Sequence, residues 1–184
     1  METFNKKIKE SGDLIEKYYK SIFWLIFIVA LILNIYKLGK IPEGVNCDEA
    51  GMAIDANDIA RYGTDRFLNH NPVYLINHGD GQSVLYAYLT VILIKIFGTY
   101  NLIIIRIPAL ILSMIEVVVC YLLVKEFKSK KMALLFMLMV TISPWHIMKS
   151  RWALDCNLFS PMQLISVYAL IKDIKAEDKK HWNM

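Results

Sequence analysis

Charged residues are scarce in this sequence. They make up only 21% of its 184 residues, whereas 56% are hydrophobic. The mean hydropathy is +0.39. An ordinary soluble domain carries more charge than this, and a disordered chain carries fewer apolar residues. The composition therefore favours an integral membrane protein and disfavours both of those classes.

Cysteine is also sparse, and no metal motif accompanies it. Cys47, Cys120 and Cys156 are odd in number, have no CxxC spacing and do not cluster with histidines. The sequence therefore predicts neither a disulfide framework nor a zinc site. The net charge of +4 does not indicate a nucleic-acid partner, because the lysines stand in short clusters between apolar runs.

A removable leader is missing as well. The first apolar run begins only near Ser21, after a polar stretch that contains lysines, and no small-residue cleavage site follows it. We therefore expect this run to stay in the protein as a membrane anchor.

Five apolar runs and three lysine clusters determine the predicted topology. The runs cover residues 21–38, 83–97, 103–124, 132–147 and 158–171. The clusters are Lys6, Lys7, Lys9, Lys17 and Lys20; Lys125, Lys128, Lys130 and Lys131; and Lys172, Lys175, Lys179 and Lys180. Lysine in short loops favours the cytoplasm. All three clusters lie inside only if the run at 83–97 is an interfacial helix and not a span.

The expected fold class is therefore an all-α integral membrane protein, a bundle of about four transmembrane helices with interfacial helices in the first outer loop. We predict a cytoplasmic segment over 1–20, a membrane module over 21–172 and a cytoplasmic tail over 173–184. The predicted spans are 21–39, 104–124, 131–147 and 157–172, with an outer loop over 40–103. The acidic loops would face the extracytoplasmic side of the cell (plasma) membrane. Five spans with a broken charge rule remain the alternative.

Two acidic motifs fall in the predicted outer loops. Asp48 and Glu49 begin a helix expected to run to about Tyr62, and Asp155 follows Arg151 at a spacing of four. An aspartate at a helix start often serves only as a cap. Near a membrane surface, a carboxylate can also take a proton from an acceptor or hold a metal ion against a phosphate.

Three further charged or polar residues have two interpretations each. Arg106, at the mouth of a membrane helix, could grip a lipid-linked phosphate or extend to bulk lipid phosphates. His78 lies in a flexible polar stretch that could contact a sugar or be a plain loop. Glu116 lies in the middle of a span, so it is either neutral or paired, and we expect its partner outside this chain.

The order of these motifs resembles the amino-terminal part of a GT-C glycosyltransferase. The likeness covers residues 20–172 and rests on Asp48-Glu49, then FGTYN with RIP, then SPWH and SRWALDCN. It is nearest to the branch of dolichyl-phosphate-mannose-protein mannosyltransferases and lipid A aminoarabinose transferases. The resemblance implies inverting transfer of a sugar from a polyprenyl phosphate carrier to an acceptor at the outer membrane face.

The resemblance also implies roles for individual residues. Asp48 would be the catalytic base with Glu49 beside it, and Asp155 would stand at the other wall of the site. Arg106, Arg151 and His78 are the candidate substrate-binding residues.

The implied partners are membrane lipids, a lipid-linked sugar donor and a protein, lipid or polysaccharide acceptor. The resemblance implies no obligatory metal ion, although two carboxylates could hold a divalent one. Family members are much longer, so we expect an amino-terminal fragment that is inactive alone. A non-catalytic membrane subunit or scaffold and a small transporter component are the alternatives. Cys47 and Cys156 could form a disulfide if both acidic motifs line one site.

Overall fold

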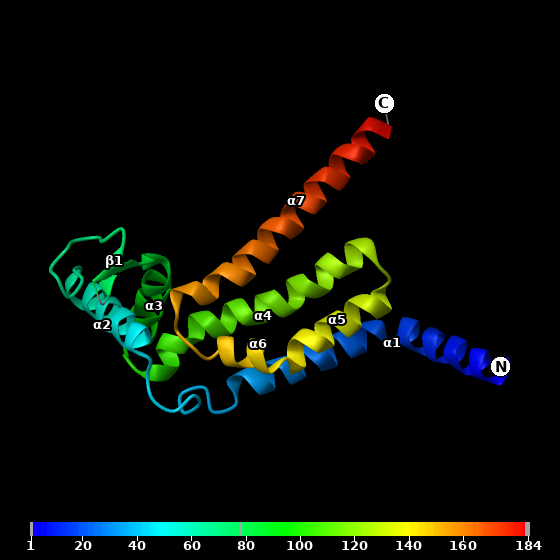
Figure 1. The fold of residues 1–184 in the computed structure, drawn as a ribbon, viewed down its shortest axis with the longest axis horizontal. Helices are drawn as coiled ribbons and strands as arrows, with labels where there is room; N and C mark the ends of the chain where they lie inside the picture. The colour runs from blue at the N-terminus through cyan, green and yellow to red at the C-terminus, as the bar shows by residue number, and fades with distance from the viewer. Residues whose placement is uncertain (1, 78, 183–184) are drawn as a thin grey trace.

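The computed structural model describes residues 2–77 and 79–182 of the chain (Figure 1). Within that part, 74% of the structure is helical, in seven helices. The elements are α1 (Glu2–Ile35), α2 (Cys47–Tyr62), β1 (Leu75–Asn77), β2 (Asp80–Gln82), α3 (Val84–Phe97), α4 (Leu102–Phe127), α5 (Lys130–Ile142), α6 (Pro144–Lys149), a 3-10 turn (Asp155–Leu158) and α7 (Phe159–Trp182). The mainly helical prediction is confirmed, and the number of membrane spans stays a prediction.

The long helices form the body of the molecule. Figure 1 shows α1, α4 and α5 running side by side, while α7 starts beside α4 and diverges from it. The chain direction alternates from α1 to α4, α5 and α7 (Figure 1). One apolar cluster joins α1, α4 and α5, and it consists of Ile26, Ala30, Met114, Val117, Tyr121, Ala133, Leu134 and Met137. This alternation is the pattern that the lysine clusters predict.

The helix limits differ from the predicted spans most clearly at Ser143. Leu14–Ile35 and Leu102–Phe127 are long and apolar enough to cross a membrane. The predicted span at 131–147 is divided at Ser143, which ends α5 and caps the first turn of α6. The following Pro144 has no backbone N–H to continue the α5 hydrogen-bond ladder. With 13 residues, α5 alone covers only about 20 Å.

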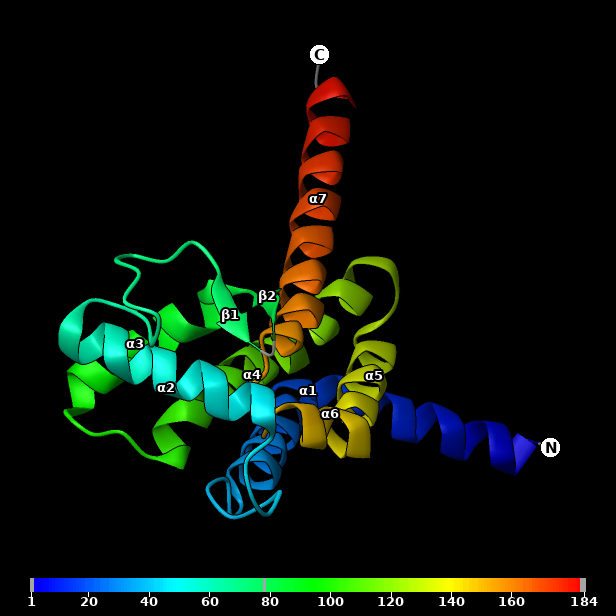
Figure 2. The same cartoon turned by 60° about the vertical axis from the view of Figure 1, so that its left-hand side comes forward.

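The predicted outer loop folds into a compact unit at one end of the bundle (Figure 2). In this unit α2 and α3 share an apolar core with the first turns of α4, and the antiparallel β1–β2 hairpin pairs Leu75 with Gln82. Asn46 caps the start of α2 through its side chain, and Gly63 ends it with a positive φ of 76°. We call this unit, α2 through α3, the α2–α3 unit.

A tyrosine hydroxyl attaches α3 to α4 beside a proline. Pro108 lies inside α4 and lacks an N–H group. Nearby, the Tyr86 hydroxyl donates to the Ile105 carbonyl at 3.0 Å and accepts from the Ala109 N–H at 3.1 Å. It thereby sits between two groups that a regular helix would pair directly. Burial raises the pKa of Tyr86, which keeps the hydroxyl protonated and able to donate.

Candidate active site

A buried ion pair lies at the junction of the α2–α3 unit and the bundle. The Arg106 side chain, from the second turn of α4, donates from Nε to Glu49 Oε1 at 2.8 Å and from Nη2 to Glu49 Oε2 at 3.1 Å. Both side chains are 0% exposed. Forked arginine–carboxylate bonds of this kind fix the orientation of both groups. The pair therefore fixes the first turn of α2 against α4.

The same two side chains also hold two separate backbone segments. Arg106 donates to the carbonyls of Leu38 and Gly44, both at 3.0 Å, in the connection between α1 and α2. Glu49 Oε1 accepts from the backbone N–H of Ala153 at 3.1 Å, in the connection before α7. Both predicted motifs, Glu49 in the first and Ala153 in the second, thus meet at one buried point. Arg106 is a candidate for contact with a lipid-linked phosphate, and in the structure its side chain is enclosed by protein.

Asp48 occupies the other side of the same helical turn. Its backbone N–H is capped by the Asn46 side chain at 3.0 Å, so Asp48 itself is not the cap. Its Oδ1 accepts from Nδ2 of Asn77, at the end of β1, at 2.9 Å. The residue is half-buried. Successive helix positions differ by about 100°, which is why neighbouring carboxylates can face protein and open space respectively.

Asp155 is bound to the other end of the same hairpin. Its Oδ2 accepts from the backbone N–H of Ser83, which follows β2, at 2.9 Å, and its Oδ1 accepts from the Cys156 N–H at 2.9 Å. Partial burial and the charges of Asp155 and Asp48 raise the pKa of the Cys156 thiol. The hairpin thus contacts Asp48 at one end, through Asn77, and Asp155 at the other, through Ser83.

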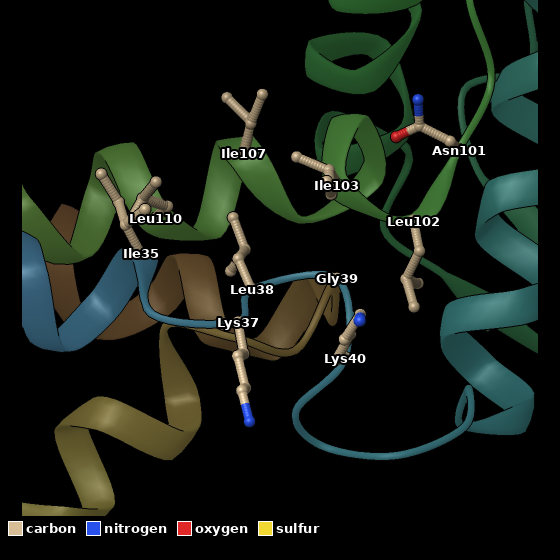
Figure 3. A pocket seen from close by; sticks show the side chains of 10 residues that line it. All are labelled: Ile35, Lys37, Leu38, Gly39, Lys40, Asn101, Leu102, Ile103, Ile107 and Leu110. Carbon is tan, nitrogen blue, oxygen red and sulfur yellow. The ribbon is translucent and has the colours of Figure 1, made fainter.

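A groove runs between the turn after α1 and the start of α4 (Figure 3). It has a volume of about 710 Å³ and is lined by Ile35, Lys37, Leu38, Gly39, Lys40, Asn101, Leu102, Ile103, Ile107 and Leu110. We call it the α1–α4 groove. Both lysines are exposed, and Figure 3 shows Lys37 extending away from α4. The groove is therefore apolar inside with two cations at its edge.

Comparison with known families gives one match. The family model of dolichyl-phosphate-mannose-protein mannosyltransferases matches residues 81–184, more than half of the sequence. The chain belongs to this family. No curated protein and no solved structure matches it. The match begins at Gly81 in β2, so it includes Arg106, Arg151 and Asp155, while Asp48 and Glu49 precede it.

Members of the mannosyltransferase family are glycosyltransferases, and the family implies a lipid-linked sugar donor, an acceptor and a membrane environment. Together with the two apolar helices, this indicates a membrane protein. The individual roles of the candidate residues stay predictions.

The remaining candidate residues lie in different surroundings. Arg151 is buried and donates to the Leu33 carbonyl at the end of α1. Burial and the charge of Arg106 lower the pKa of Arg151. His78 lies outside the described residues. Cys47 and Cys156 are both exposed and free, so the structure contains no disulfide between them.

The partner of Glu116 lies inside the chain, so the expectation that it lies elsewhere is wrong. Lys149 Nζ donates to Glu116 Oε2 at 2.6 Å, and the Ser160 hydroxyl donates to Oε1. His146 Nε2 stands 3.8 Å from the same carboxylate. These groups line a cavity of about 430 Å³ between α4, α5, α6 and α7. The break at Ser143 turns α6 so that Lys149 reaches α4.

Sequence reasoning missed three residues that are linked to Asp48 one after another. Asn77, Arg66 and Asp55 form a chain of contacts that ends on the Asp48 carboxylate. The only available signal was the polar stretch around His78, for which a sugar contact and a plain loop were both left open. The contact between Ser83 and Asp155 was also missed, because a backbone donor leaves no mark in the sequence.

Proposed function

We propose that this chain carries the acidic part of the active site of a membrane glycosyltransferase. The enzyme would transfer a sugar from a polyprenyl phosphate carrier to an acceptor at the outer membrane face. The observation that carries the proposal is that one hairpin binds both acids. Asn77 at one end of it contacts Asp48, and Ser83 at the other end contacts Asp155. The carboxylates of Asp48 and Asp155, which come from distant motifs, are thus both bound to one hairpin at the end of the bundle.

In this reaction Asp48 is the base. As the acceptor oxygen or nitrogen attacks the anomeric carbon, Asp48 takes the proton of the acceptor. The bond between the anomeric carbon and the phosphate oxygen breaks, and the lipid phosphate leaves with the electron pair. Asp48 suits this role because it is half-buried and its Oδ1 is held by Asn77, which fixes the direction of the carboxylate. Asp155 forms the opposite wall.

The buried Glu49–Arg106 pair would act by holding the site together. Both side chains are 0% exposed, so we propose that neither touches the substrate. Arg106 joins the α1–α2 connection to α4, and Glu49 joins the segment before Asp155 to α2. The distance between the two acidic residues therefore depends on this pair.

The α1–α4 groove is the proposed location of the donor lipid. Its apolar walls suit a hydrocarbon chain, and Lys37 and Lys40 at its edge suit a phosphate. Leu38 links the groove to the site, because it lines the groove while its carbonyl binds Arg106. Replacing both lysines by glutamine is expected to raise KM for the donor several-fold, whereas Lys95→Gln on α3 is the control.

The test of the function is transfer from a radiolabelled polyprenyl phosphate sugar in membranes. We propose that the chain is the amino-terminal portion of a longer enzyme, so the assay uses its complete open reading frame. Removing the base by Asp48→Asn is expected to lower kcat by about 10²-fold or more. The control is Asp58→Asn on the same helix, which should transfer normally. An Asp48→Asn protein with normal kcat would remove Asp48 as the base, and no transfer by the unchanged protein would favour a scaffold.

A further inference from the structure

A second set of residues lies behind Asp48 on one face of α2. Asp48, Gly51 and Asp55 are spaced by three and four residues, so they share that face. Arg66, in the connection that follows α2, lies along it. Its Nε is 3.3 Å from Asp55 Oδ1, and its backbone N–H donates to the same oxygen at 3.1 Å. The Asp55 side chain is 1% exposed, so this anchor is buried.

Arg66 in turn holds Asn77 in one orientation. Its Nη2 donates to the Ile76 carbonyl at 2.7 Å and to Asn77 Oδ1 at 3.2 Å. An asparagine amide has an acceptor oxygen on one side and a donor nitrogen on the other. With the oxygen facing the guanidinium, the nitrogen must face Asp48, and it donates to Oδ1 at 2.9 Å. A reversed amide would place N–H against guanidinium and oxygen against carboxylate.

Gly51 makes room for this arrangement. A Cβ atom at position 51 would lie 2.5 Å from Asn77 Oδ1 and 3.0 Å from Arg66 Nη2. Both distances are too short for ordinary contacts, so any side chain there would displace the Arg66–Asn77 pair. A glycine in the second turn of a helix costs up to about 1 kcal/mol relative to alanine. The close approach of the Asn77 and Arg66 side chains is a structural reason for a glycine at position 51.

We infer that Asn77, held by Arg66 and Asp55, is the positioning residue for the Asp48 base. This inference rests on the proposed function. The Asn77 amide holds Oδ1, which directs Oδ2 toward the acceptor. Among the described residues, the Asp48 carboxylate accepts a side-chain hydrogen bond only at Oδ1, from Asn77.

The test compares three variants in the transfer assay described above. Asn77→Ala removes the donor, and Asn77→Asp replaces it by an acceptor of nearly the same shape. Gly51→Ala displaces Asn77 without changing it. Each is expected to lower kcat by about 10-fold to 10²-fold with KM for the donor within about two-fold, because a misdirected base affects the chemical step. Gly81→Ala is the control, since its added Cβ meets only Tyr74 at 3.8 Å.

The comparison of kcat with KM, both measured per folded enzyme, separates positioning from folding. Loss of the Asn77 donor misdirects the Asp48 carboxylate and lowers kcat at an unchanged KM for the donor. A structural defect alone would lower the amount of folded enzyme without lowering kcat per folded molecule. If Asn77→Ala does not fold, Gly51→Ala and Asn77→Asp carry the test. Normal kcat in the folded variants would overturn the inference. If Asp48→Asn is inactive in the same assay, the proposed function survives that result, whereas an active Asp48→Asn would refute the function itself.

Discussion

The buried Glu49–Arg106 pair provides a prediction of stability that needs no substrate. In Arg106→Gln, the Glu49 carboxylate keeps the Ala153 N–H and loses both guanidinium bonds. The carbonyls of Leu38 and Gly44 lose their donors as well. Removing one partner of a buried ion pair costs about 3–5 kcal/mol, because the other charge is left uncompensated. We expect Arg106→Gln to lower the free energy of unfolding by an amount in this range.

The assay is thermal unfolding in detergent, followed by the far-ultraviolet circular dichroism of the helices. For a chain of this size, 1 kcal/mol corresponds to about 2–4 °C, so the melting temperature should fall by on the order of 10 °C. The matched control is Arg61→Gln in the last turn of α2, where the side chain is exposed. That substitution should change the melting temperature by about 1–2 °C at most.

A double variant makes the test sharper. The double variant Glu49→Gln with Arg106→Gln leaves no buried charge at positions 49 and 106, so it should be more stable than Arg106→Gln alone. Equal melting temperatures for Arg106→Gln and Arg61→Gln would refute the buried pair. Arg106 would then be free to contact the donor phosphate, as the resemblance implies.

Three further measurements test the topology and the site. Cysteines introduced at Asn71 and Lys128 should react with an impermeant maleimide only at Asn71 in intact cells, and labelling at Lys128 would favour five spans. With the other cysteines replaced by serine, Asp48→Asn should speed alkylation of Cys156 at fixed pH. The charge of Asp48 is one cause of the raised pKa of the Cys156 thiol, so its loss lowers that pKa and increases the thiolate fraction. An unchanged alkylation rate would show that Asp48 does not act on the site around Cys156 and Asp155. Tyr86→Phe should lower the melting temperature by several degrees, because two hydrogen bonds beside the proline are lost, and a loss below about 1 °C would contradict them.

Local signals predicted α2 almost to the residue. A helix from Asp48 to about Tyr62 was expected, and it runs from Cys47 to Tyr62. Asn46 and Gly63 supply the start and stop signals, and both act within one turn of the chain. The division of the predicted span at Ser143 could also have been anticipated, because Pro144 cannot continue the ladder of α5.

Contacts between distant residues could not be predicted in this way. Glu49 and Arg106 are 57 positions apart, and Lys149 reaches Glu116 across 33. A guanidinium at the mouth of a membrane helix has the same sequence context whether it faces lipid phosphate or a buried carboxylate. Its direction depends on the helix face that packs, and that face is determined by the α2–α3 unit and not by neighbouring residues.

The adjacent acids of the first motif illustrate how one turn of helix can serve two purposes. Glu49 points into protein, where both of its oxygens bind Arg106 and one also binds the Ala153 N–H. Asp48, one position earlier, points to the hairpin and accepts from Asn77. Exchanging the two residue types would place a shorter carboxylate opposite Arg106 and a longer one against Asn77, which would disturb both contacts. Because each carboxylate fits the distance to its own partner, we expect Asp48→Glu to impair transfer without a large loss of stability, whereas Glu49→Asp should lower stability. Similar losses of stability in both variants would contradict this division of roles.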